Sequence, residues 1–384
     1  MQTHSPHPTY TPRMNILRGL RSGLRSGFHK DARRLALLLA VLLTACSTGI
    51  DRPVGTPTPR GGNPATPQAD QPAQPEESSR LGAVNVDILV FPDDGVDVLV
   101  DLIKSARERV FLKIYMFSEA RIFEALEQAH ADGVDVRVQI EPSPLGGSSM
   151  AKAAQTRLRK AGINVKTTNP AFRLTHEKSY VIDDQAVILT ANMTRSSFTR
   201  NRELAVVTSD PRDIAEITAA FEADWNREAF IPQNPNLVWS PDNSRTKIDA
   251  LIEGAQNTLD VYAASTLDDE QLGLLAAARK RGVKVRLLTS ARGGSDGEDA
   301  AAGDLDRLQR ARVKVRYLKS PLVHAKAFVA DYGEPNALGF VGSVNITTQS
   351  LDFNRELGIL IADDSALTRL HDLFEADWTK ATDR

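Results

Sequence analysis

Cysteine is almost absent from this chain. Cys46 is the only one among 384 residues, so the folded part can form no disulfide and carry no thiolate chemistry. The apolar run at residues 35–45 is shorter than the roughly 18–20 residues that cross a bilayer. No glycine-rich loop precedes an expected helix, and no His/Cys/Asp cluster has metal-ligand spacing. The sequence therefore predicts no metal site and no cofactor.

The first 45 residues have the pattern of an export signal. Seven Lys and Arg stand between Arg13 and Arg34 against one acid, Asp31, and the short apolar run follows. The tetrapeptide LTAC, which ends at Cys46, resembles the lipobox of bacterial lipoproteins, whose cysteine receives lipid after cleavage. We predict a signal peptide over 1–45, export to the cell envelope and attachment to a membrane through a lipid on Cys46. An ordinary secretory signal or an uncleaved anchor is the alternative.

Residues 46–83 are predicted to be a disordered tether. The stretch 47–80 holds seven prolines and no aromatic residue, and such a segment cannot bury enough apolar surface to offset its ordering entropy. Ordered protein is expected from about Leu81. Removing residues 1–45 takes away 7 − 1 = 6 positive charges, which leaves about −2 − 6 = −8. An acidic chain argues weakly against sequence-independent binding to nucleic acid.

The remaining sequence is an internal duplication. Similar segments recur at offsets of 148 to 153 residues, and FEADW occurs identically twice. A nearly constant offset over a half-chain indicates duplication. The matching positions are Pro92 and Pro241, Gly133 and Gly282, His176 and His324, Asn201 and Asn354, and Phe221 and Phe374.

Each half is predicted to be an α/β lobe, over 84–235 and 236–384. In the first half, expected helices near 95–108, 119–133 and 150–161 alternate with apolar strands, which favours helices covering a mainly parallel sheet. The two lobes are expected to form one pseudo-two-fold unit in a monomeric chain. The aromatic residues of the two FEADW segments are expected to pack a terminal helix on each sheet, and Arg202 is expected to pair with carboxylates.

Two of the seven histidines begin the same pattern. HEKSYVIDD starts at His176 and HAKAFVADY at His324, each with a lysine two residues on and an aspartate seven residues on. In a strand, His176 and Lys178 share a face, whereas Asp183 faces the other way or lies at the strand end, where structural pairing is expected. TANMT (190–194), GSVNIT (342–347) and two NREL segments follow.

This constellation resembles the phospholipase D superfamily, whose signature is H-x-K-x4-D, then G-S-x-N, then a glutamate. The second half matches in full, while Leu189-Thr190 replaces Gly-Ser in the first. The resemblance implies that the first histidine is the nucleophile. It implies a catalytic set of His176, Lys178, Asp183, Glu203, His324, Lys326, Asp331 and Glu356, and phosphate-binding side chains Thr190, Asn192, Ser343 and Asn345.

The chemistry of these residue types suits a phosphodiester. Two lysines and two asparagine amides can bind its negative oxygens without a metal ion. Imidazole titrates near neutrality, so one ring can be a neutral nucleophile and the other a cationic acid. Hydrolysis then proceeds in two steps through a phosphohistidine. A buried glutamate would orient each ring, and both halves must meet at one site, which explains the duplication.

The substrate stays open at this stage. Hydrolysis or transfer of phospholipid head groups is the first hypothesis, because the expected lipid anchor places the lobes at a membrane. A nuclease of the same superfamily is the second. A cardiolipin synthase-like phosphatidyltransferase is another, although such synthases usually carry two transmembrane helices before the motifs, and none is expected here. A non-catalytic binding protein is disfavoured because both residue sets are intact.

Overall fold

The computed structural model describes residues 81–264, 267–290 and 298–384, without the side chains of 298–302. All of these residues belong to one compact unit of the chain. The expected signal peptide, Cys46 and the tether up to residue 80 lie outside the described residues. Among the described helices, none has the length and apolar character needed to cross a bilayer.

The first sheet contains the strands of the first half. Its order is β1 (Val86–Phe91), β7 (Asn201–Thr208), β6 (Gln185–Leu189), β5 (Ser179–Ile182), β2 (Arg109–Ile114), β3 (Asp135–Ile140) and β4 (Asn164–Thr167). Among these seven strands, only β2, β3 and β4 run parallel; the short strand β12 (Leu322–Val323) of the second half adds a parallel pair with β7. The other pairs are antiparallel.

The second sheet repeats this arrangement. Its order is β16 (Thr382–Asp383), β11 (Lys314–Tyr317), β10 (Lys284–Thr289), β9 (Thr258–Tyr262), β13 (Ala327–Ala330), β14 (Leu338–Gly342), β15 (Glu356–Ile361) and β8 (Leu237–Ser240). Again only three strands, β9 to β11, are parallel.

Two duplicated lobes with mixed sheets are thus confirmed, but the prediction that each sheet is mainly parallel is wrong. The physical reason lies after the histidine motif. β5 and β6 are joined by two residues, 183 and 184, and β13 and β14 by seven, 331–337. A connection this short can join only antiparallel strands, whereas parallel neighbours need a crossover.

The helices also repeat. In the first half they are α1 (Asp97–Ser105), α2 (Ala120–Ala131), α3 (Ser148–Lys160), α4 (Arg195–Thr199) and α5 (Pro211–Asn226); in the second they are α6 (Ser244–Gly254), α7 (Asp269–Arg281), α8 (Glu298–Arg310), α9 (Thr348–Asp352) and α10 (Asp364–Lys380). The Asp210 carboxylate caps α5 and that of Asp363 caps α10. Gly133 and Gly282 follow α2 and α7 with positive φ, a conformation that glycine adopts at little cost.

Three hydrophobic cores hold these layers. One packs α1 to α3 on the first sheet, and one packs α6 to α8 on the second. The third is shared by both sheets and contains Phe221 of α5, Phe374 of α10, Val90 and Ile359. As expected, the FEADW aromatics pack: each phenylalanine stacks on the tryptophan four residues later, with ring centroids 5.7 Å apart in both copies.

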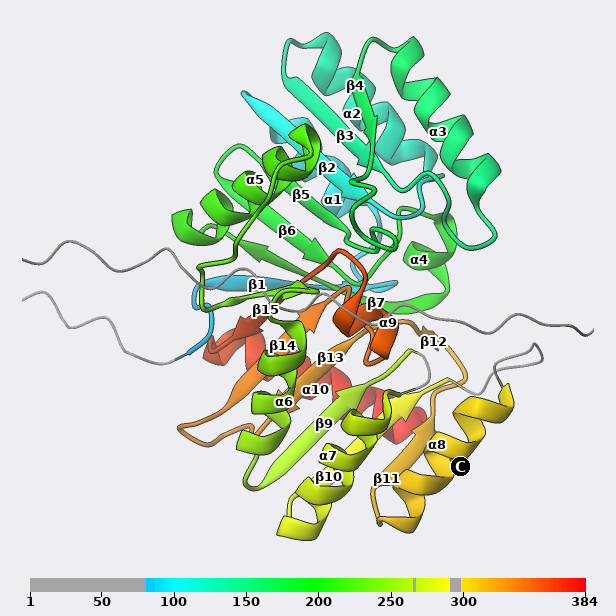
Figure 1. Cartoon of the computed structure of the whole chain (residues 1–384), viewed down its shortest axis with the longest axis vertical. Helices are drawn as coiled ribbons and strands as arrows, with labels where there is room; N and C mark the ends of the chain where they lie inside the picture. Colours follow the sequence, from blue (N-terminus) through cyan, green and yellow to red (C-terminus); the bar gives the residue numbers. More distant parts are fainter. Residues whose placement is uncertain (1–80, 265–266, 291–297) are drawn as a thin grey trace, which may run out of the picture. The chain divides into compact units, whose positions relative to one another are not determined.

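The two sheets meet along β6, β7, β14 and β15, which contact one another across the lobe boundary (Figure 1). The short strand β12 (Leu322–Val323) of the second half pairs with β7 of the first. Both histidine motifs begin at this boundary, so the fold brings them to the place where the sheets join.

Candidate active site

Backbone hydrogen bonds to the opposite lobe hold both histidines. The His176 amide donates to the carbonyl of Arg355 at 2.9 Å, and the His324 amide donates to the carbonyl of Arg202 at 3.1 Å. Each histidine therefore lies beside the NREL strand of the other half. His176 and His324 stand just before β5 and β13, in extended segments rather than within the strands.

Each imidazole is also bound by a glutamate from the other sheet. Nδ1 of His176 lies 2.9 Å from Oε2 of Glu356, and Nδ1 of His324 lies 2.8 Å from Oε1 of Glu203. Both carboxylates are fully buried. A carboxylate at Nδ1 fixes the ring and leaves Nε2 for chemistry; Nε2 of His324 also lies 3.4 Å from Nζ of Lys326. Neither lobe holds its own histidine in this way, so the histidine–glutamate pairs need both halves.

A lysine accompanies each histidine. Nζ of Lys178 donates to the carbonyl of His176 at 2.5 Å, and Nζ of Lys326 donates to that of His324 at 2.6 Å. Both lysines are buried. Burial, together with the charge of Lys326, lowers the pKa of Lys178, and burial lowers that of Lys326 to about 8. An anion placed between the two lysines would relieve the repulsion between their charges.

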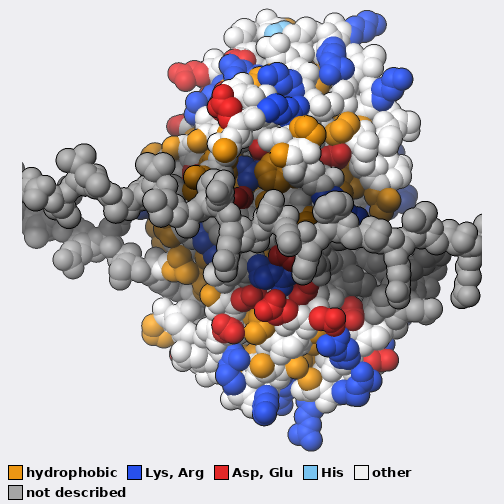
Figure 2. All heavy atoms as spheres, in the orientation of Figure 1, with side chains coloured by type: hydrophobic (Ala, Val, Ile, Leu, Met, Phe, Trp, Pro, Cys, Tyr) orange, Lys and Arg blue, Asp and Glu red, His pale blue; other side chains and the backbone are white. Residues whose placement is uncertain are grey.

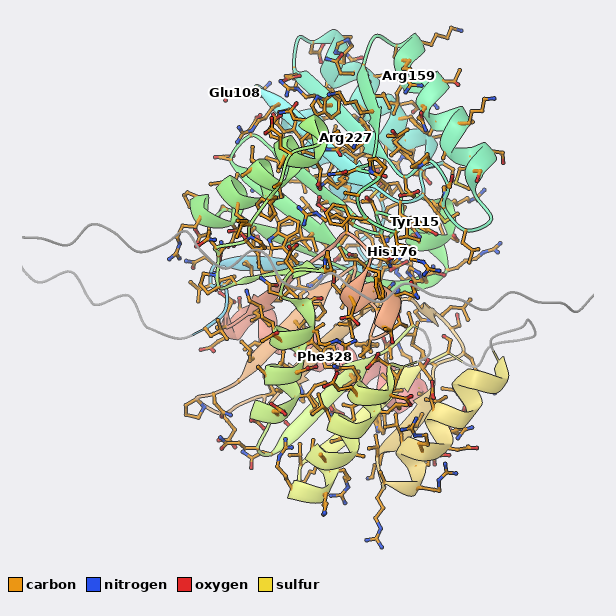
Figure 3. The ribbon with its side chains drawn as sticks, viewed as in Figure 1. Glu108, Tyr115, Arg159, His176, Arg227 and Phe328 are labelled. Atoms are coloured by element: carbon orange, nitrogen blue, oxygen red, sulfur yellow. The ribbon has the colours of Figure 1, made fainter. Side chains whose placement is uncertain are left out.

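Tyr115 makes the two histidine environments unequal. Its ring packs edge-on against His176, with centroids 4.8 Å apart, and Figure 3 labels the two residues side by side. Its hydroxyl accepts a hydrogen bond from the amide of Leu145. The residue 149 positions later is Ala264. The His176 side chain is accordingly 12% exposed and that of His324 32%.

The pKa values follow this difference in burial. Burial and the charge of Lys178 lower the pKa of His176 to about 4, although Glu356 opposes the change. Burial also lowers the pKa of His324. The histidine and lysine partners lower the pKa of Glu203 to about 2 against the effect of burial. At neutral pH the site therefore contains neutral imidazole at His176 beside ionised carboxylates.

His176 should consequently remain neutral down to a pH of about 4. Burial disfavours the charged form of His176, so below a pH of about 6.5 the unfolded chain binds a proton at this histidine that the folded chain does not. The free energy of unfolding therefore decreases as the pH falls from about 6.5 towards 4. NMR titration of the His176 ring carbons in the free protein tests this expectation. A midpoint near the ordinary value of about 6.5 would contradict it.

Two predicted phosphate-binding residues, Thr190 and Ser343, hydrogen-bond between neighbouring strands. The Thr190 hydroxyl donates to Glu203 at 2.7 Å and accepts from the Leu204 amide. The Ser343 hydroxyl donates to the carbonyl of Leu357 and accepts from its amide. Both side chains are fully buried. Thr190 thus takes the structural place of the serine in the first lobe, and a role of either residue in phosphate binding stays a prediction.

Asn192 and Asn345 remain available to a substrate. Within the described residues, the side-chain oxygen of each is buried and has no hydrogen-bond partner. Buried polar atoms are normally paired. An amide oxygen accepts hydrogen bonds, so its partner from outside would be a donor such as water, and the amide N–H groups are the atoms that would donate to a phosphate. Their role in phosphate binding stays a prediction.

Sequence reasoning missed the asparagines that begin the two NREL segments. Nδ2 of Asn201 donates to Glu203 and Nδ2 of Asn354 donates to Glu356, at 3.4 and 3.1 Å. Asn201 binds Oε1 of Glu203, the oxygen that also contacts His324, whereas Asn354 binds Oε1 of Glu356 and His176 contacts Oε2. The signal was present in the sequence, because the asparagine stands two residues before the glutamate in both copies.

The motif aspartates lie away from the histidines, at the far ends of β5 and β13. Asp183 accepts hydrogen bonds from the amides of Arg107, Glu108 and Arg109, and Figure 3 shows Glu108 at the opposite end of the first sheet from His176. Asp331 binds the amides of residues 256–258 in the same way. The structure shows the structural pairing expected from their offset, and the activity of variants decides whether they also act in catalysis.

Replacing either aspartate should therefore lower stability without stopping catalysis. We expect Asp183→Asn and Asp331→Asn each to cost about 2–3 kcal/mol of unfolding free energy, because charge-assisted hydrogen bonds to three amides weaken. The amides lower the pKa of both carboxyls, so the stabilisation holds above the ordinary carboxyl pKa and is lost as the pH falls through the lowered value.

Denaturant unfolding and turnover per folded molecule measure the two effects separately. Asp184→Asn, at the exposed neighbouring position, is the matched control and should change neither. A loss of turnover by orders of magnitude in folded Asp183→Asn would restore a catalytic role.

Buried ion pairs connect the lobes behind the site. Arg202 forms a two-pronged pair with Asp377, at 2.7 and 3.0 Å, and Arg355 binds Asp224 at 3.0 Å. The aspartates belong to the FEADW segments, for which the sequence predicted a packing role of the aromatic residues only. Each arginine directly precedes the glutamate that holds a histidine. The ion pairs therefore fix β7 and β15 where those glutamates emerge, and Arg202 pairs with carboxylates as expected.

Two other polar clusters in the described residues lie outside this site. Ligand atoms of Asp260, His371 and Glu375 lie within 4.8 Å of one another, a grouping that could hold a metal ion. The Arg286 guanidinium, however, donates to both carboxylates, at 2.7 and 2.6 Å. The arginine thus already supplies the positive charge that a metal would bring.

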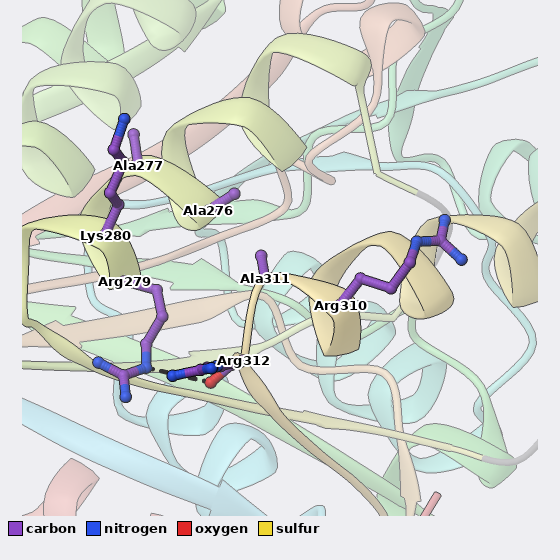
Figure 4. Close-up of a pocket in the computed structure, with 7 residues that line it drawn as sticks. All are labelled: Ala276, Ala277, Arg279, Lys280, Arg310, Ala311 and Arg312. Carbon is purple, nitrogen blue, oxygen red and sulfur yellow. Dashed lines mark hydrogen bonds between the residues drawn. The ribbon is translucent and has the colours of Figure 1, made fainter.

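The second cluster is a basic hollow between the ends of α7 and α8. Arg279, Lys280, Arg310 and Arg312 line it together with three alanines, around about 550 Å³ (Figure 4). The Arg279 guanidinium donates to the carbonyl of Arg312. The hollow lies at the carboxyl-terminal ends of α7 and α8. The histidine region lies at the carboxyl ends of the parallel strands, which is the opposite edge of the sheet. The hollow is therefore separate from the site.

Comparison with known proteins agrees with this geometry. A family model described as cardiolipin synthase, PLD-like domain, matches residues 99–225 and again residues 248–378. The chain belongs to this PLD-like family. The two matches fall on the two lobes, so each lobe is a PLD-like domain, and the cross-lobe site is the place where two such domains meet.

The relatives differ in what they do. Cardiolipin synthase A of Pseudomonas aeruginosa is 34% identical over 144 residues, which cover 36% of this chain and 29% of the synthase. Human mitochondrial cardiolipin hydrolase is 30% identical over 138 residues, or 35% of this chain and 51% of the hydrolase. The PLD-like protein thus spans less than a third of the length of the synthase.

Among solved structures, phosphatidylserine synthase of Haemophilus influenzae superposes with a TM-score of 0.56 over 79% of this chain and 88% of that one. The identity is 15%, so this likeness speaks for the fold alone. It is consistent with a two-lobed PLD-like architecture.

Proposed function

We propose that this PLD-like protein cleaves the phosphodiester of phospholipid head groups through a phosphohistidine, at one site built by both lobes. The observation that carries the proposal is the crossed arrangement: each histidine is held at Nδ1 by a glutamate of the other sheet and accompanied by a buried lysine. This provides a nucleophile, an acid and two cations in one place.

In the first step, Nε2 of His176 attacks phosphorus and the bond to the leaving oxygen breaks. His324, in its imidazolium form with Nδ1 bound to Glu203, gives the proton on Nε2 to that oxygen. In the second step, His324 takes a proton from water, the resulting hydroxide attacks phosphorus, and His176 leaves. Lys178 and Lys326 stabilise the charge that builds on the phosphoryl oxygens. The deeper burial and lowered pKa of His176 support its role as the nucleophile.

Transfer to an alcohol in place of water is the second candidate. The family description and the synthase from Pseudomonas aeruginosa favour it. The chemistry is the same until the second step, in which an alcohol replaces water as the group that His324 deprotonates. The acceptor therefore decides between hydrolase and transferase.

A parallel assay tests the proposal. The purified protein is incubated with phosphatidylcholine, phosphatidylglycerol and single-stranded DNA, with and without glycerol as acceptor and with EDTA. We expect cleavage or transfer on lipid that EDTA leaves unchanged, because the lysines neutralise the phosphate. Cleavage of DNA with no action on lipid would contradict the proposed substrate and make the protein a nuclease.

Export and lipid attachment at Cys46 are a further part of the proposal, supported by the sequence pattern. Cys46→Ser should release the protein from membranes in its host, since the variant loses the acceptor for lipid. Membrane fractionation and metabolic labelling with palmitate measure this. Wild-type protein that takes up no label at Cys46 would refute it, as would a variant that fractionates unchanged.

A further inference from the structure

Large hydrophobic side chains are exposed next to the histidine motifs. Leu145 is 89% exposed, Phe353 49% and Leu322 47%. Leu322 stands two residues before His324, Phe353 three before Glu356, and the Leu145 amide is bound by Tyr115, which packs on His176. Leu145 and Phe353 lie in connections between elements and Leu322 begins β12, so the three residues come from three separate segments around one site. Exposed apolar groups gathered at a site commonly mark a surface of interaction.

Leu322 and Phe353 lie at the lobe boundary, and each has an arginine beside it. The Leu322 amide donates to the carbonyl of Arg200, and the Arg173 amide donates to the carbonyl of Phe353. Lys319 lies three residues before Leu322. All three cationic side chains are exposed, and none has a carboxylate partner within the described part of the chain. Figure 2 shows hydrophobic, basic and acidic side chains near the band where the sheets meet.

The nearby acids are bound by other cations. Asp352, next to Phe353, shares Arg245 with Asp268 and Glu270, and Asp242 shares Arg355 with Asp224. Arg173, Arg200 and Lys319 form no ion pair with these acids in the described residues, so their charges remain available to an outside partner. A combination of exposed apolar side chains with unpaired cations is typical of surfaces that enter the headgroup region of an anionic bilayer.

We propose that Leu145, Leu322 and Phe353, with Arg173, Arg200 and Lys319, form a rim that docks the active site onto a bilayer containing anionic phospholipid. The apolar side chains enter the bilayer while the cations bind lipid phosphates. This rests on the proposed function, because a lipid must reach the histidines from the bilayer. Two exposed leucines suit acyl chains, whereas binding of single-stranded nucleic acid relies on aromatic stacking.

Site-specific fluorescence tests the rim directly. In the full chain carrying Cys46→Ser, which has no other cysteine, Leu145→Cys and Phe353→Cys are labelled with an environment-sensitive dye. Val84→Cys is the control: Val84 is 46% exposed but follows Ala83, which bridges Ile361 at the end of β15 away from Glu356. On vesicles of phosphatidylglycerol and phosphatidylcholine, labels at 145 and 353 should shift to the blue, and that at 84 should not.

Activity supplies the second readout. Leu145→Ser with Phe353→Ser should lower cleavage of vesicle lipid on the order of tenfold, while hydrolysis of a soluble p-nitrophenyl phosphodiester stays unchanged. Arg173→Gln with Arg200→Gln should weaken binding to anionic vesicles. Arg310→Gln with Arg312→Gln, in the basic hollow, is the matched charge control and should not.

The proposal of a docking rim would be contradicted if the labels at 145 and 353 did not shift on vesicles, or if the label at 84 shifted as much as they do. It would also be contradicted if Arg310→Gln with Arg312→Gln weakened vesicle binding as much as Arg173→Gln with Arg200→Gln, or if the labels shifted with single-stranded DNA but not with vesicles. Lipid cleavage with unshifted labels would reject the rim alone. Shifted labels without cleavage of any lipid would reject the proposed function and leave the rim as a membrane-docking surface.

Discussion

His176→Ala should abolish both turnover and formation of the phosphohistidine. The substitution removes the only atom that bonds to phosphorus in the first step, and loss of a covalent nucleophile costs several orders of magnitude in kcat. The loss should extend to substrates with activated leaving groups, because no leaving group compensates for a missing nucleophile. Turnover of a p-nitrophenyl phosphodiester and of vesicle lipid measures it.

His130→Gln is the matched control for this change. His130 lies in the last turn of α2, outside the crossed histidine–glutamate pairs, so the variant should keep wild-type turnover. Substantial turnover by a well-folded His176→Ala protein would show that His176 is not the nucleophile.

His324→Ala should separate substrates by their leaving groups. Lipid cleavage should fall by several orders of magnitude, because an alkoxide cannot leave without a proton. The first step on a p-nitrophenyl phosphodiester should persist, since p-nitrophenolate is a stable anion. The second step should be slow, because His324 is also the base that activates water, so a burst of p-nitrophenol followed by slow turnover is expected.

Rapid mixing with absorbance detection measures the burst. Equal loss on both kinds of substrate, with no burst, would contradict the role of His324 as the general acid. Loss of folding would be detected independently by the unfolding transition of the variant.

The sequence was informative where the duplication made patterns repeat. Two copies of the histidine motif predicted a shared site, and alternating helices and strands predicted two α/β lobes. The sheets are less parallel than expected because the hairpins after each motif are too short for crossovers. The motif alone does not show whether Asp183 has a catalytic or a structural role, and only the structure shows that three backbone amides donate to its carboxylate.

What the sequence could not supply was pairing between residues far apart. Nothing in the NREL segments states that Glu203 binds the histidine of the other lobe, or that Arg202 reaches Asp377 at a separation of 175 residues. The asymmetry of the two histidines was equally hidden, since it depends on Tyr115, which lies in neither motif. Comparing the two copies position by position would have shown that Tyr115 has Ala264 as its counterpart.

The central claim is that both lobes build one site in which His176 attacks phosphorus. Rapid-quench trapping with a phosphodiester radiolabelled at phosphorus, followed by peptide mapping, tests it most directly. The account predicts label on His176 alone in the wild-type protein and label that accumulates on His176 in His324→Ala. Label on His324 in the wild-type protein would reverse the roles. Label on His176 in His324→Ala together with label on His324 in His176→Ala would show two independent sites and contradict the shared site.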